Sequence, residues 1–129
     1  MAEAGRRPVV RVVAWSAVAD VVSIVVFVAL GRKNHDEGGN IVTGTLKVAA
    51  PFLIALALGW LAARAWKSPT SPTTGVQIWV VTVVAGMLLR HFVFDRGTAL
   101  PFIIVASGFT LLFLVGWRFV WEWWAARRA

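Results

Sequence analysis

Four long apolar runs constrain the fold of this chain more than any other feature of its sequence. They cover roughly residues 9–30, 48–66, 76–94 and 99–120 of a 129-residue sequence. Each run approaches the ~20 residues that an α-helix needs to cross ~30 Å of hydrocarbon. The mean hydropathy is +0.76 and 59% of the residues are hydrophobic, whereas a soluble domain is roughly half apolar. We therefore predict an all-α, integral membrane four-helix bundle, made of two transmembrane helical hairpins in a single domain over residues 1–129.

The distribution of basic residues predicts how these spans are oriented. With four spans, the two chain ends and the segment 67–75 share one side of the membrane, and that side carries eight Lys and Arg residues against five on the other. Because basic residues are enriched in cytoplasmic segments, we expect both termini in the cytoplasm. The first set is Arg6, Arg7, Arg11, Arg64, Lys67, Arg118, Arg127 and Arg128, and the second is Arg32, Lys33, Lys47, Arg90 and Arg96.

The same topology gathers the tryptophans in one half of the membrane. Indole rings favour the headgroup level, and all eight tryptophans fall in the predicted cytoplasmic half. The stretch from Trp121 to Trp124, followed by Arg127 and Arg128, either forms an interfacial end to the last helix or simply anchors it. The full set is Trp15, Trp60, Trp66, Trp79, Trp117, Trp121, Trp123 and Trp124.

The net charge of +7 raises the question of an anionic partner. The thirteen Lys and Arg residues are dispersed at helix ends rather than massed on one face, so we expect no nucleic acid. The expected partners are the lipid bilayer and its anionic headgroups, and a homo-oligomer or a larger membrane complex stays open. The sequence contains no cysteine, which excludes disulfides and thiolate chemistry.

One ionisable residue, Asp20, lies near the centre of the first apolar run. A carboxylate there costs at least ~2.5–3.5 kcal/mol on insertion scales, so it should face the bundle interior and be protonated, paired or hydrated. We expect Arg90 as its cation, because Arg90 shares a helix face with Thr82 and Gly86. The alternative is a protonated Asp20 that bonds Thr82, Thr110 or the backbone. The expected intramembrane polar core is Asp20, Arg90, Ser23, Thr82 and Thr110.

Small and polar residues at helical spacing predict which sides of the helices face one another. In lipid, helices associate through close backbone approach and interhelical hydrogen bonds. Pro51 and Pro101 are each expected in a first helical turn, where the missing N–H costs nothing. The expected protein-facing residues are Ser16, Asp20 and Ser23, then Ala55, Gly59 and Ala63, then Thr82, Gly86 and Arg90, and finally Ser107 with Thr110.

A second group of polar residues is expected at the outer face of the membrane. Arg32 and His35 in "GRKNHDEGGN", together with His91 after the third run, form a basic cluster that could hold an anion or a lipid phosphate. Solvated loop charges are the alternative interpretation. The two histidines lack any ligand spacing, so we expect no metal, and nothing in the sequence indicates a cofactor.

Two functions stay open after the search for motifs. The sequence has no HExxH, no GxSxG, no Gly-rich phosphate loop and no pair of carboxylates on one helix face, so we expect no enzyme. The first function is binding or transport of a small ion or solute through Asp20 and Arg90. The second is a non-catalytic accessory subunit or scaffold of a larger membrane complex. Four short helices leave little room for a private solute cavity, which favours an oligomeric or accessory role.

Four segments carry a resemblance to a known family. They are "DVVSIVVFVALGRKNH" from residue 20, "PFLIALALGW" from 51, "GVQIWVVTVVAGMLLR" from 75 and "PFIIVASGFTLLFLVGWR" from 101. The second and fourth share a Pro-Phe start and a Gly-Trp pair. Together the segments resemble the small four-pass membrane proteins, largely actinobacterial, of the domain-of-unknown-function family 3054. The resemblance implies an integral plasma-membrane protein of four-helix form, and it supplies no activity and no functional residue.

Overall fold

Four long α-helices make up most of the computed structural model. It describes residues 2–34, 41–93 and 100–128, without the side chains of residues 2–9, 32–34, 41, 100 and 102. Within these ranges the chain forms four α-helices, one short 3-10 helix and no strand. All four α-helices are long and apolar enough to cross a membrane, which confirms the predicted fold class. The elements are α1 (Ala2–Asn34), α2 (Ile41–Ala63), η1 (Ala65–Lys67), α3 (Pro72–Phe92) and α4 (Leu100–Arg128).

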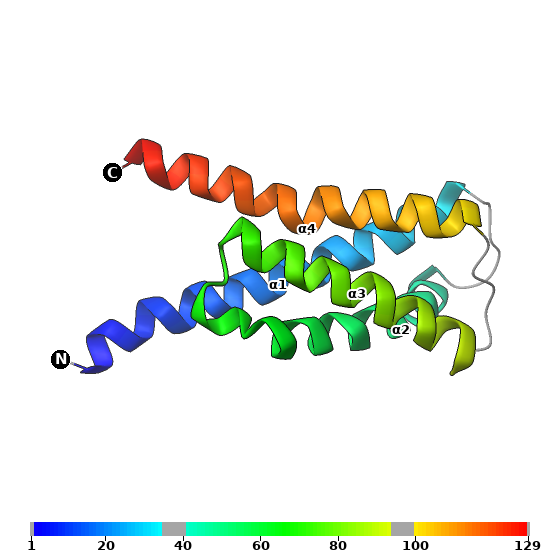
Figure 1. Cartoon of the computed structure of the whole chain (residues 1–129), viewed down its shortest axis with the longest axis horizontal. Coiled ribbons are helices and arrows are strands. Elements are labelled where there is room, and N and C mark those ends of the chain that lie inside the picture. Colours follow the sequence, from blue (N-terminus) through cyan, green and yellow to red (C-terminus); the bar gives the residue numbers. More distant parts are fainter. Residues whose placement is uncertain (1, 35–40, 94–99, 129) are drawn as a thin grey trace.

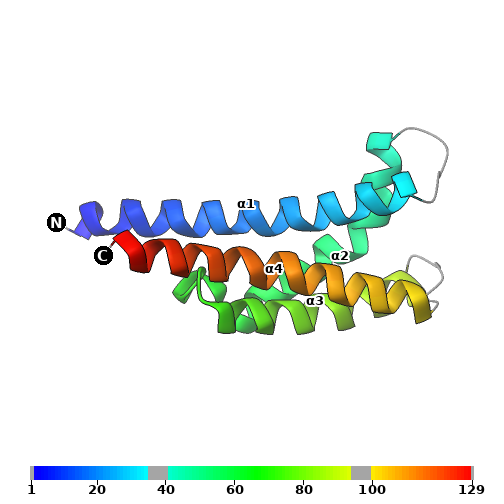
Figure 2. The same cartoon turned by 90° about the horizontal axis from the view of Figure 1, so that it is seen from above.

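The helices pack as two antiparallel hairpins. α1 contacts α2 and α4, and α3 contacts the same two helices. Both chain ends and the connection between α2 and α3 lie at one end of the bundle, which we call the terminal end (Figure 1). Because α1 has 33 residues and α4 has 29, whereas α2 has 23 and α3 has 21, the outer two helices continue beyond this connection (Figure 2).

The start of α2 departs from the expectation. The helix begins at Ile41 rather than near residue 48 and ends at Ala63 rather than near 66. Pro51 therefore lies inside the helix, so its expected place in a first turn is wrong, whereas Pro101 does lie in the first turn of α4. Figure 2 shows the first turns of α2 directed away from the rest of the helix. An interior proline removes a backbone hydrogen bond and bends a helix, which accounts for this shape.

The closest helix packing joins α2 to α3 through glycine. A Cβ atom on Gly59 would lie 3.1 Å from the carbonyl oxygen of Ile78, and one on Gly86 would meet the ring of Phe52. Ala55, Gly59, Thr82 and Gly86 are all buried, as are Ser16, Asp20 and Thr110 on the other two helices. The prediction that small and polar residues mark the protein-facing sides is confirmed at these positions.

A short connection at the terminal end joins α2 to α3. Arg64 has φ 49° and ψ 52°, a left-handed conformation that stops α2. Pro72 then opens α3 at a position where proline is favoured. The residues between them bring the carbonyl oxygen of Pro69 against α4, where it contributes to the site described next.

Candidate functional site

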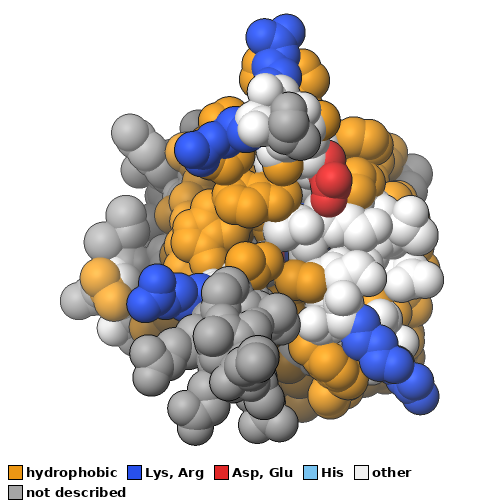
Figure 3. All heavy atoms as spheres, turned by 90° about the vertical axis from the view of Figure 1, so that its left-hand side faces the viewer, with side chains coloured by type: hydrophobic (Ala, Val, Ile, Leu, Met, Phe, Trp, Pro, Cys, Tyr) orange, Lys and Arg blue, Asp and Glu red, His pale blue; other side chains and the backbone are white. Residues whose placement is uncertain are grey.

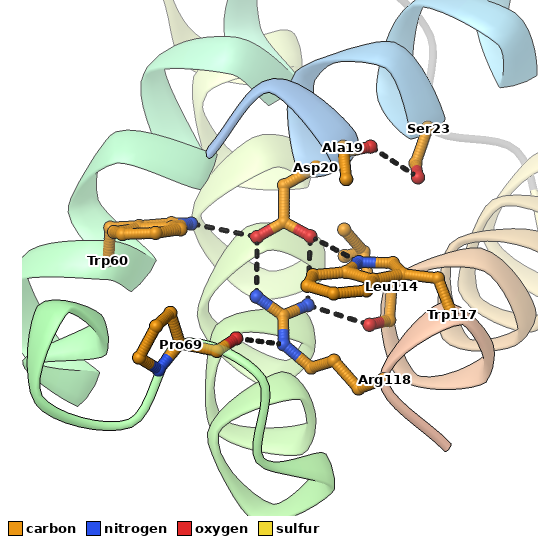
Figure 4. Close-up of polar contacts among 8 residues, drawn as sticks. All are labelled: Ala19, Asp20, Ser23, Trp60, Pro69, Leu114, Trp117 and Arg118. Atoms are coloured by element: carbon orange, nitrogen blue, oxygen red, sulfur yellow. Dashed lines mark hydrogen bonds and ion pairs between the residues drawn. The ribbon is translucent and has the colours of Figure 1, made fainter. Parts of the chain in front are cut away.

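The most polar feature inside the described bundle is an ion pair between Asp20 of α1 and Arg118 of α4 (Figure 4). Arg118 Nη1 donates to Asp20 Oδ1 at 2.8 Å, and Nη2 donates to Oδ2 at 2.7 Å. Both side chains are 0% exposed. The planar guanidinium therefore meets the carboxylate in the two-pronged geometry that makes the strongest hydrogen-bonded pairs.

Two indole groups complete the contacts of the carboxylate. Trp60 Nε1 of α2 donates to Asp20 Oδ2, and Trp117 Nε1 of α4 donates to Oδ1, both at 2.8 Å. Each carboxylate oxygen thus accepts two N–H groups. An ionised carboxylate offers about four acceptor positions, so Asp20 has no vacant one.

Arg118 also binds the backbone on both sides of the pair. Its Nε donates to the carbonyl oxygen of Pro69 at 2.9 Å, and Nη1 donates to that of Leu114 at 2.7 Å. The guanidinium carbon lies 4.3 Å from the centre of the Trp117 ring. Four of the five guanidinium N–H groups have a partner, and the network joins α1, α2, α4 and the α2–α3 connection.

The first turn of α3 makes room for this arginine. A Cβ atom on Gly75 would lie 2.8 Å from Arg118 Cδ and 3.2 Å from the carbonyl oxygen of Leu114. Only a residue without a side chain lets α3 approach α4 here while Arg118 passes between them. Gly75 is therefore a positioning residue for the ion pair.

The expectation that Arg90 neutralises Asp20 is wrong, because Arg118 fills that role. Gly75, at the level of Arg118, and Arg90 are fifteen residues apart on α3, which corresponds to ~22 Å along a helix. Asp20 lies at the centre of its own apolar run but beside the α2–α3 connection, because α1 extends past that connection. Asp20 and Arg90 therefore lie at different positions along the long axis of the bundle.

The expected hydroxyl partners of Asp20 also bind elsewhere. Thr110 Oγ1 donates to the carbonyl oxygen of Ala106 at 2.6 Å, and Ser23 Oγ donates to that of Ala19 at 2.8 Å, each within its own helix. Thr82 Oγ1 is buried without a hydrogen-bond partner among the described residues. Of the five residues expected in the polar core, only Asp20 belongs to the observed network, so the alternative in which Asp20 bonds Thr82 or Thr110 is wrong as well.

The expected basic cluster at the outer face falls largely outside the described part of the chain. His35 lies in the segment 35–40, which the structure does not describe, and the side chain of Arg32 is likewise outside it. His91 is exposed near the end of α3, with its ring 4.8 Å from that of Phe92. The cluster of Arg32, His35 and His91 stays a prediction.

Sequence reasoning missed Arg118, Trp60 and Trp117 as parts of the site. Arg118 counted only as a base at a helix end, and the two tryptophans counted only as headgroup anchors. One signal was available, since both tryptophans follow a glycine in the segments that share a Pro-Phe start. These two Gly-Trp pairs are the positions that converge on Asp20.

The arrangement is a closed network that holds helices together. Burying two charges is expensive, and only good geometry with extra hydrogen bonds offsets that cost. Both conditions hold here, because the pair is two-pronged, the carboxylate accepts two further N–H groups, and two further guanidinium N–H groups bind backbone carbonyls. Removing one partner would leave the other charge buried and unpaired, so the site fixes how α1 and α4 sit against the α2–α3 connection.

Comparison with known proteins gives a family and no activity. No curated protein and no solved structure matches the chain significantly. A family model described as a protein of unknown function matches residues 17–121, a range that includes Asp20, Trp60, Trp117 and Arg118. The resemblance seen in the sequence is thus confirmed, and the chain belongs to the DUF3054 family.

Proposed function

We propose that this membrane protein is a non-catalytic accessory subunit or scaffold, rather than a transporter in which Asp20 carries a proton or cation. The saturated ion pair is the observation that carries the proposal. A relay must gain and lose its cargo, which needs a carboxylate oxygen that is vacant or accessible. Asp20 accepts four N–H groups and is 0% exposed, so its contacts suit a structural bond.

The outward face of α4 supports a role in lateral association. At Gly108 and Gly116 a Cβ atom would meet nothing within 4 Å. Glycine inside a helix costs about 1 kcal/mol relative to alanine, and neither residue makes room for a neighbour among the described residues. In membranes, small residues let a second helix approach closely. A helix of a partner subunit or of a second copy would benefit from this open surface.

The plasma membrane, with both termini in the cytoplasm, is the location that we propose. The terminal end holds both chain ends and the α2–α3 connection, which are the segments with eight of the thirteen Lys and Arg residues. The positive-inside rule assigns that end to the cytoplasm.

Native mass measurement of the extracted protein tests the accessory role. When the wild-type protein is extracted with its surrounding lipid, it should carry a second protein component in fixed ratio, either a partner subunit or another copy of the chain. Gly108→Leu with Gly116→Leu should remove that component, because leucine would occupy the space that another helix would use, at positions where a Cβ atom meets none of the described residues within 4 Å. Gly31→Leu is the matched control, because it also meets nothing within 4 Å. Recovery of wild-type protein as an isolated monomer would contradict the proposal, and so would equal loss in the control.

Proton flux tests the transport alternative directly. In proteoliposomes under a pH gradient, the wild-type protein should give no flux above that of protein-free vesicles. A pH-dependent flux that disappears in folded Asp20→Asn protein would overturn the proposal. Folding of this variant must be checked, since its amide NH₂ would face N–H donors in place of an acceptor oxygen.

A further inference from the structure

A second feature of the terminal end is a groove between α1 and α4. Both helices continue past the α2–α3 connection and diverge there (Figure 1), and side chains from both line the hollows between them. The ring of Trp15 on α1 lies 5.3 Å from that of Trp117 and 5.1 Å from that of Trp121, both on α4. We call this space the tryptophan groove.

The tryptophan groove is large enough to hold part of a ligand. One hollow of about 510 Å³ lies within the ~300–1,000 Å³ typical of ligand sites. An adjoining hollow of about 280 Å³ shares two of the lining residues, Trp15 and Trp121. The first is lined by Trp15, Trp117, Val120, Trp121, Trp123 and Trp124, and the second by Arg11, Val12, Trp15 and Trp121.

Positive charge surrounds this apolar wall. Arg11 lines the groove from α1, and Figure 3 shows basic side chains around hydrophobic ones at this end. The guanidinium carbon of Arg127 lies 4.3 Å from the centre of the Trp123 ring, and that of Arg128 lies 4.6 Å from that of Trp124. Glu122, the acid in this part of α4, accepts a hydrogen bond from Thr70. The guanidinium groups of Arg127 and Arg128 thus lie over two of the aromatic rings that line the groove.

We infer that the tryptophan groove binds an anionic phospholipid, with its phosphate against Arg11, Arg127 or Arg128 and its upper acyl chain against the indole rings. The lining is almost wholly hydrocarbon and aromatic, so it suits an acyl chain and offers little to a water-soluble anion. Guanidinium groups at the rim suit a phosphate. Tryptophan-rich helix ends lie at headgroup depth, where such a lipid presents both parts.

Quenching by brominated lipids tests the inference, because five of the eight tryptophans line the groove. The full-length protein is placed in phosphatidylcholine vesicles with a small fraction of acyl-brominated phosphatidylglycerol or of acyl-brominated phosphatidylcholine. Phosphatidylglycerol should be enriched at least about five-fold at the groove, the factor that one basic residue near an anionic surface supplies. Quenching should rise accordingly, and unbrominated phosphatidylglycerol should reverse it.

Matched charge variants separate the groove from general surface charge. Arg11→Gln with Arg127→Gln and Arg128→Gln should abolish the preference for phosphatidylglycerol. Lys47→Gln with Arg64→Gln and Lys67→Gln removes the same charge from exposed positions outside the groove lining. This triple variant should retain the preference for phosphatidylglycerol.

Four results would overturn the inference. Equal quenching by both lipids would mean simple anchoring, and equal loss in both triple variants would mean a diffuse surface effect. Relief of quenching by glycerol phosphate would assign the groove to a water-soluble anion. Weak quenching by both lipids in a protein that is dimeric by light scattering would assign it to a second copy.

Discussion

Arg118 uses its guanidinium group in three directions at once. It binds Asp20 with two nitrogens, the Leu114 carbonyl along its own helix, and the Pro69 carbonyl in the α2–α3 connection. A lysine ammonium is a point charge that lacks this fixed fork of donors. The residue is therefore specified by the geometry of its acceptors as well as by charge.

Replacing Arg118 with lysine tests that geometry. Arg118→Lys keeps the positive charge but cannot reach all of these acceptors at once. We expect the free energy of unfolding to fall by about 1.5–3 kcal/mol, the contribution of at least one hydrogen bond to a charged group. Arg127→Lys, at an exposed position on the same helix, should leave it unchanged. Circular dichroism during unfolding by SDS in mixed micelles measures both, and equal stability of the two variants would contradict this account.

The sequence predicted at residue scale that Asp20 is buried and needs a partner, and this is confirmed. It predicted the wrong arginine because residue spacing shows which residues share a helix face, but not how far one helix is shifted along its neighbours. Arg90 shares a face with Thr82 and Gly86, and this made it the best candidate. Arg118 also shares a buried face with Thr110 and Leu114, but its position along the bundle depends on how far α1 and α4 extend past the α2–α3 connection.

Among the elements, the start of α3 carries most of the constraint on the site. Its first turn brings Gly75 against Arg118 and Leu114, and its connection to α2 presents the Pro69 carbonyl. A left-handed residue, Arg64, and a proline at the helix start set the course of the chain between them. The α2–α3 connection and the first turn of α3 thus form one side of the ion-pair site.

Two glycine substitutions with opposite expected signs test this role of α3. Gly75→Ala would place a methyl group 2.8 Å from Arg118 Cδ, on a side chain that four hydrogen bonds hold in place. We expect overpacking to lower stability by about 1–3 kcal/mol. Gly108→Ala meets no atom and should raise stability by up to about 1 kcal/mol through helix propensity. Thermal unfolding in detergent compares them, and a stabilised Gly75→Ala would disprove the tight contact.

At the scale of the whole molecule, the bundle has two unlike ends. The terminal end combines both chain ends, the ion pair, the tryptophan groove and the basic residues around it. Interfacial tryptophan and arginine are typical of the headgroup region, so this end should lie at one membrane surface. The opposite end holds the last turns of α1 and α3 and the first turns of α2 and α4.

Cysteine labelling tests the orientation, and the absence of native cysteine makes single introduced residues specific reporters. Ser68 and Val93 are exposed at opposite ends of the bundle. With the terminal end in the cytoplasm, a membrane-impermeant maleimide should label Val93→Cys in intact cells and Ser68→Cys only after permeabilisation. The reverse pattern would invert the proposed orientation, and labelling of both from outside would contradict membrane-spanning hairpins.

The sequence by itself determined that four helices are long and apolar enough to span a membrane, that small and polar residues face one another, and that a buried acid needs neutralising. These properties depend on run length and residue spacing, which are local. Only the tertiary structure decided that Arg118, Trp60 and Trp117 surround Asp20, and that α1 and α4 leave a groove between them. Both outcomes depend on how far each helix is shifted along its neighbours. That shift follows from helix lengths and from the α2–α3 connection, which apolar periodicity does not encode.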